Sequence, residues 1–218
     1  MTTDHDSPAK STWPRKTLFR LVTGGMAGFV GANVMMALID GPVVGGLEDS
    51  AAIAALVGFL YGLMGIGVLV GSAMPRAGAA FLNVEDADEI REQKRMLLYS
   101  GVSSLLWGGA LIVLALAAPD GPIPQATALI VAAGFLVIGT ALCVPIYRAA
   151  DELMLAVMRE GGSLGGWLMF AVIGSWAAFA HLGYVPGPQP LDLLSLLYAL
   201  MLAASFIVIF RRGMVRGG

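Results

Sequence analysis

Side chains that bind metals or carry redox chemistry are scarce in this sequence of 218 residues. It contains one cysteine, Cys143, and two histidines, His5 and His181. A single cysteine excludes a disulfide bond within the chain, and because Cys143 lies in an apolar segment we interpret it as a small buried side chain. The sequence therefore predicts no disulfide framework.

Charged residues are also few, at 13% of the chain, against roughly 25% in a soluble domain. The mean hydropathy is +0.80, and a helix needs roughly 20 apolar residues to cross a membrane. Six apolar segments approach or exceed this length: 21–39, 51–74, 96–118, 126–147, 164–185 and 193–210. These segments predict an all-α polytopic membrane protein with six transmembrane helices in residues 21–211, after a disordered cytoplasmic tail at 1–20.

Lys and Arg are absent from the first, third and fifth gaps between these segments. The thirteen basic residues are Lys10, Arg15, Lys16, Arg20, Arg76, Arg91, Lys94, Arg95, Arg148, Arg159, Arg211, Arg212 and Arg216. Short loops rich in Lys and Arg stay in the cytoplasm. The pattern predicts six spans with both termini cytoplasmic, and it shows no basic patch for direct binding of nucleic acid.

Charge is missing from the interior of the spans as well. No Asp, Glu, Lys or Arg lies in the central part of any of the six segments, and this argues against an ion-coupled transporter, a metalloenzyme or an intramembrane protease. His181 lies near the outer end of its segment, where we expect its ring to bond to a loop carbonyl. His5 lies on the opposite face, so one chain cannot supply two histidines to a haem. We therefore expect no catalytic residue, no metal and no cofactor.

Small residues are abundant in the first segment. Gly24, Gly28 and Gly31 approximate one face of a helix, and Asn33 is the most deeply placed polar residue. Small residues let helix backbones approach closely in lipid, and an Asn side chain hydrogen-bonds across helices. We expect these four residues to form a helix-packing face. The second segment also has glycines at helical spacing, at Gly58, Gly62 and Gly65.

Charges of both signs gather on the cytoplasmic side. Residues 83–95 are expected to form a helical extension of the third span, and residues 149–160 a second cytoplasmic helix that ends at Gly161-Gly162. The candidate partner-binding residues are Asp88, Glu89, Arg91, Glu92, Asp151 and Glu152. A solvated helix end is the simpler interpretation of this charge pattern.

The chain also carries signs of an internal repeat. An offset of 63 aligns Asp88 with Asp151 and Glu89 with Glu152, and the outer gaps share Pro and Gly turns. These matches predict a helical hairpin used repeatedly, in units of about 1–75, 76–147 and 148–218.

The two acidic motifs, Asp88-Glu89-Ile90-Arg91 and the degenerate Asp151-Glu152-Leu153, carry a resemblance. Residues 85–214 resemble small polytopic inner-membrane proteins of unknown function from bacteria, alphaproteobacterial ones in style. The second motif departs from the first by lacking the Arg. No catalytic residue follows from this resemblance, because such families have none assigned.

The leading hypothesis from the sequence is a non-enzymatic membrane protein that holds a partner. That partner would be a cytoplasmic regulatory protein docked on the charged segments, a membrane subunit, or a second copy of the chain packed on the glycine faces. The alternative is a small transporter or channel for a neutral or apolar substrate. A cavity lined by polar or aromatic side chains at the middle of the membrane would favour the alternative.

Overall fold

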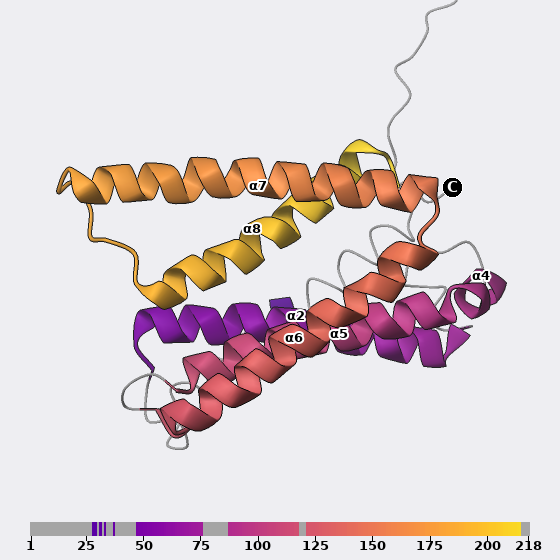
Figure 1. Ribbon diagram of the computed structural model, residues 1–218, viewed down its shortest axis with the longest axis horizontal. Coiled ribbons are helices and arrows are strands. Elements are labelled where there is room, and N and C mark those ends of the chain that lie inside the picture. Colours follow the sequence, from indigo (N-terminus) through magenta and orange to yellow (C-terminus); the bar gives the residue numbers. More distant parts are fainter. Residues whose placement is uncertain are drawn as a thin grey trace, which may run out of the picture.

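The computed structural model describes residues 47–75, 87–117 and 121–214, together with residues 28, 29, 31, 33 and 37. The described elements are all helical (Figure 1). They are α2 (Asp49–Ala73), α4 (Ala87–Glu92), α5 (Lys94–Ala115), α6 (Gln125–Ala149), α7 (Glu152–His181) and α8 (Pro190–Arg211). Within the described residues, five helices are long and apolar enough to cross a membrane: α2, α5, α6, α7 and α8.

The last five apolar segments of the sequence each correspond to one of these long helices, so the predicted all-α fold is confirmed for the described residues, and its five long helices are consistent with a multi-pass membrane protein. The first segment, 21–39, lies mostly outside the described residues, as does the tail at 1–20. The count of six spans, the disorder of the tail and the cytoplasmic position of the termini therefore stay predictions.

Two helices end in the same way. After α7, Gly183 has a φ of 79°, its N–H bonds to the carbonyl of Ala180, and the N–H of Tyr184 bonds to the carbonyl of Phe179. The rings of Phe179 and Tyr184 meet edge to face at 6.4 Å, which is the apolar contact that accompanies this type of helix end. Gly213, with a φ of 69°, ends α8 by the same pattern of bonds.

The predicted break at Gly161-Gly162 is wrong. Helix α7 continues through both glycines and runs for 30 residues to His181. The charged pair Arg159-Glu160 precedes the glycines, but an apolar run from Leu164 follows them, and a backbone that left the helix on entering such a run would lose hydrogen bonds that no water replaces. This loss outweighs the roughly 1 kcal/mol that a glycine costs inside a helix.

The predicted extension at 83–95 is present only in part. Helix α4 covers Ala87–Glu92, a turn at Gln93 follows, and α5 begins at Lys94. Residues 83–86 lie outside the described part of the chain. The third span and its extension are thus two helices rather than one.

The helices pack mostly on their neighbours in the chain. Helix α5 lies against α2 on one side and α6 on the other, α7 packs on α8, and α8 also touches α2. In Figure 1, α8 slants between α7 and the group of α2, α5 and α6. The pairs α5/α6 and α7/α8 are helical hairpins, but the superposition that would establish a repeat stays a prediction.

The contact between α2 and α5 is built on glycine. A Cβ atom added to Gly58 would lie 2.6 Å from the carbonyl oxygen of Gly108, and one added to Gly65 would lie 2.7 Å from the carbonyl oxygen of Gly101. The two pairs run in opposite order along the helices, so α2 and α5 are antiparallel. Only a residue without a Cβ permits this approach, which lets backbones make van der Waals contact in lipid.

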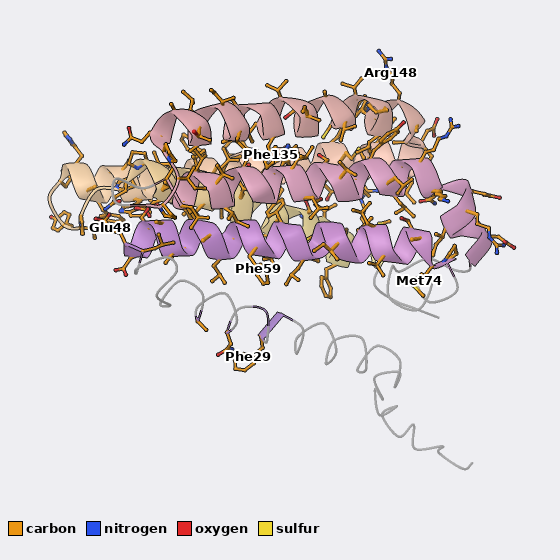
Figure 2. The ribbon with its side chains drawn as sticks, turned by 90° about the horizontal axis from the view of Figure 1, so that it is seen from below. Phe29, Glu48, Phe59, Met74, Phe135 and Arg148 are labelled. Atoms are coloured by element: carbon orange, nitrogen blue, oxygen red, sulfur yellow. The ribbon has the colours of Figure 1, made fainter. Side chains whose placement is uncertain are left out.

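Basic residues gather at one end of the bundle. In Figure 2, Glu48 marks one end of α2, and Met74 and Arg148 lie toward the other. Helix α5 begins and α8 ends at this second end, where Arg212 pairs with Glu160 of α7 at 2.8 Å. This arrangement agrees with the segregation of Lys and Arg along the sequence.

Candidate ligand-binding site

Four helices enclose a cavity of about 200 Å³. Helix α2 supplies Tyr61 and α5 supplies Trp107, while α6 and α8 supply the remaining side chains. The lining residues are Tyr61, Trp107, Leu136, Thr140, Leu197, Tyr198 and Met201. An aromatic cavity shared by four helices is a frequent form of small-molecule site in a helical bundle.

The cavity lies near the middle of the helices. Twelve residues of α2 precede Tyr61 and twelve follow it. Each of the other lining residues has at least seven residues of its helix on either side, which corresponds to roughly 10 Å of helix. The cavity is therefore remote from both ends of the bundle.

Two tyrosines form the floor. The hydroxyl of Tyr61 donates a hydrogen bond of 2.9 Å to the backbone carbonyl of Tyr198, and the two rings meet edge to face with centroids 5.1 Å apart. The two side chains are only 8% and 9% exposed. An edge-to-face pair of this kind is attractive beyond its apolar contact, so it holds α8 against α2.

Trp107 is positioned by a glycine of the neighbouring helix. A Cβ atom on Gly139 would lie 2.7 Å from Cδ1 of Trp107, so the indole ring occupies the space that any other residue would fill. Beside it, the hydroxyl of Ser103 donates to the carbonyl of Gly139 at 2.8 Å. Cys143, half-buried, lies within 3.7 Å of Ser103. It contributes to this α5–α6 contact as a small side chain, but it is half-buried rather than buried as expected.

The mouth of the cavity is mostly apolar, although the lining residue Thr140 is exposed there as well. Leu136 of α6 and Leu197 and Met201 of α8 are 36%, 41% and 36% exposed. No charged residue lines the cavity. Exposed apolar side chains at the middle of a membrane-spanning helix face lipid, so the site opens sideways toward the hydrocarbon. It is suited to a neutral, largely apolar molecule.

The predicted partner-binding residues lie elsewhere, at the basic end of the bundle. Asp88 and Arg91 form an exposed ion pair within α4, and Glu92 is exposed. The carboxylate of Asp151 accepts a 2.7 Å bond from the N–H of Met154 and so caps α7, while Glu152 is exposed.

The side chain of Glu89 lies outside the described part of the structure. The two acidic motifs have different local roles, because Asp151 is the N-cap of a long helix and Asp88 lies inside a short one. Each role also serves the stability of a helix end, so these contacts do not by themselves indicate a partner.

The predicted packing face of the first segment is described in part. A Cβ atom on Gly31 would lie 2.8 Å from Cε1 of Phe59 in α2, whereas one on Gly28 would meet no atom within 4 Å. Figure 2 shows Phe59 on the side of α2 that faces Phe29. Asn33 donates to the carbonyl of Phe29, four residues earlier, at 2.7 Å, so the bond expected across helices is instead local. Gly24 lies outside the described residues.

The expected bond from the ring of His181 to a loop carbonyl does not occur among the described residues, so this expectation stays a prediction. The loop carbonyl after α7, that of Pro186, accepts its bond from the indole N–H of Trp176 at 2.9 Å. His181 is the exposed last residue of α7, and no group of three or more His, Cys, Asp or Glu side chains suited to a metal occurs among the described residues.

Reasoning from the sequence missed the cavity, although a signal was present. Trp and Tyr normally lie at the membrane boundary, whereas Tyr61 and Trp107 lie deep in their segments and Tyr198 lies inside its own. Comparison with protein-family models, curated proteins and solved structures gives no match for this chain. We therefore infer the function from the site itself.

Proposed function

We propose that this protein is a small membrane transporter for a neutral, largely apolar molecule. The observation that carries the proposal is the aromatic cavity at the middle of the bundle, floored by Tyr61 and Tyr198. Transporters hold their substrates near the bilayer midplane, between helices. A neutral substrate needs no charged partner, which accords with the uncharged lining.

The substrate enters from the lipid in this proposal. The exposed side chains of Leu136, Leu197 and Met201 form an apolar mouth, and an apolar molecule is already concentrated in the hydrocarbon. We propose that the protein has six spans with both termini in the cytoplasm, and that it lies in a bacterial inner membrane. We propose no enzymatic step, because the described lining holds no nucleophile paired with a base.

Fluorescence quenching tests whether the cavity binds such a molecule. The chain has four tryptophans, and replacing Trp13, Trp167 and Trp176 by Phe leaves Trp107 as the only reporter. Bromododecane added to this variant in lipid nanodiscs should quench its fluorescence with saturation. The matched control keeps Trp167, an exposed side chain on α7, as the only tryptophan, and its quenching should rise linearly with the bromododecane content of the lipid. Linear quenching of both variants would refute binding in the cavity.

A second candidate function is the tethering of a cytoplasmic partner. Helix α7 has 30 residues and so measures about 45 Å, which exceeds the roughly 30 Å of the hydrocarbon core. Its first turns, with Glu152 exposed, therefore project beyond the membrane beside the other charges of this end. A projecting charged helix end offers a docking surface. Any membrane-spanning helix longer than the hydrocarbon core has such an end, with or without a partner.

A further inference from the structure

Three polar side chains that line the cavity make no side-chain hydrogen bond to the protein among the described residues. Tyr198 is 9% exposed, yet its hydroxyl has no hydrogen-bond partner among the described residues. The indole N–H of Trp107 and the hydroxyl of Thr140 likewise have none in the described structure. Tyr61 differs, because its hydroxyl is already committed to the carbonyl of Tyr198.

Polar groups in apolar surroundings are usually paired, because an unpaired donor forfeits its interaction with water. Some helical hydroxyls of this protein follow that rule, whereas the buried hydroxyl of Ser50 in α2 has no partner among the described residues. Ser175, Ser195 and Ser205 each donate to the carbonyl four residues earlier, at 2.5, 2.8 and 2.9 Å. Thr140 makes no such bond to Leu136 in the described structure. Unpaired donors from three helices thus line one cavity, and Tyr198, the most buried of them, favours a ligand that accepts a hydrogen bond.

The chemistry of these groups selects the kind of ligand. All three are able to donate a hydrogen bond, but the indole of Trp107 has no acceptor. A ligand oxygen that only accepts is thus matched by all three donors. A ligand hydroxyl also accepts from the indole, but it brings a proton of its own, which Tyr198 or Thr140 must then accept instead of donating. A charged group is disfavoured, because no opposite charge lines the cavity.

We infer that the substrate is a neutral molecule whose apolar body carries a carbonyl oxygen, held by hydrogen bonds from Tyr198, Trp107 and Thr140. A ketone, a quinone and an ester all belong to this class. This inference rests on the proposed function, since it specifies the ligand of the same cavity. The carbonyl lies at the aromatic floor, and the apolar body extends toward Leu197 and Met201 at the mouth.

The experiment compares two probes of equal length in the variant that keeps only Trp107. Bromododecanone carries the carbonyl and bromododecane lacks it. We expect both to quench with saturation and the ketone to bind more tightly. The substitution Tyr198→Phe should weaken binding of the ketone about fivefold, as expected for one hydrogen bond, and leave binding of the hydrocarbon unchanged. It keeps the backbone carbonyl that accepts from Tyr61.

Two controls make the result specific. Thr140→Val, which keeps the shape of the side chain, should weaken the ketone alone. Tyr184→Phe, at an exposed position outside the cavity, should change neither probe. Equal affinity for the two probes, or an equal loss for both in Tyr198→Phe, would overturn the carbonyl assignment while leaving the proposed binding of an apolar molecule intact. Absence of saturation with either probe would instead remove the proposed function itself.

Discussion

At the scale of single residues, Tyr61 connects the fold with the site. Its ring packs on Tyr198, its hydroxyl bonds to α8, and its side chain lines the cavity. The same residue therefore holds two helices together and leaves the hydroxyl of Tyr198 unused. Because the hydroxyl of Tyr61 is already bonded to α8, Tyr61 contributes the shape of the cavity. Its neighbour Tyr198 supplies the hydrogen bond to a ligand in our proposal.

The substitution Tyr61→Phe tests this division of roles. It removes one bond between helices and keeps the ring, so we expect a loss of about 1 kcal/mol in the free energy of unfolding. Titration of helicity with sodium dodecyl sulfate in mixed micelles measures this loss. Tyr61→Ala should cost about 3–5 kcal/mol, because it also removes the ring. A Phe variant as unstable as the Ala variant would contradict the assignment.

At the scale of helices, glycine decides which faces meet. The sequence drew attention to Gly24, Gly28 and Gly31 and also to Gly58, Gly62 and Gly65. Among the described residues, a close backbone contact joins Gly58 and Gly65 of α2 to Gly108 and Gly101 of α5, glycines that the sequence had not singled out. Spacing along one helix shows that a face is narrow, but it does not say which other helix lies on it. That choice depends on tertiary packing, which a single sequence does not display.

Two glycines one turn apart on α2 give a matched pair of substitutions. Gly58→Ala places a Cβ atom 2.6 Å from the backbone oxygen of Gly108, so the helices must separate, whereas Gly62→Ala meets no atom within 4 Å. We expect Gly58→Ala to destabilise the protein by about 1–3 kcal/mol. Gly62→Ala should be neutral or stabilising by up to about 1 kcal/mol. The same unfolding titration reads both, and equal effects would show that α2 and α5 do not pack through Gly58.

The charged segments also belong to this scale. If they form a docking surface, replacing Asp88, Glu89 and Glu92 together by Lys should release a cytoplasmic partner at moderate salt, because surface charge governs encounter and specificity. Pull-downs from membranes, compared by mass spectrometry, measure the loss. A control reverses Glu48, at the opposite end of α2. Identical recovery from wild type and the triple variant would leave the segment as a solvated helix end.

At the scale of the whole molecule, hydropathy and charge predicted more of the fold than of the site. Runs such as 51–74 and 193–210 show the spans because lipid demands continuous apolar helices. The cavity depends on Tyr61, Trp107 and Tyr198, which come from three helices far apart in the sequence. Nothing in their spacing brings them together, and only their depth in the segments distinguishes them from boundary aromatics.

The orientation of the bundle follows from charge alone and is open to direct test. The single native cysteine, Cys143, is removed as Cys143→Ala, and one cysteine is then introduced at Glu48, Gln189, Glu92 or Glu152. Because Lys and Arg are retained in the cytoplasm, a thiol reagent that does not cross membranes should label Glu48→Cys and Gln189→Cys in intact spheroplasts. Glu92→Cys and Glu152→Cys should react only after the membrane is permeabilised.

Helix α2 begins after Glu48, and α5 begins just after Glu92, so these two positions report opposite ends of one antiparallel pair. Labelling of both in intact spheroplasts would contradict a membrane-spanning α2, and labelling of Glu92→Cys alone would invert the topology and place both termini outside.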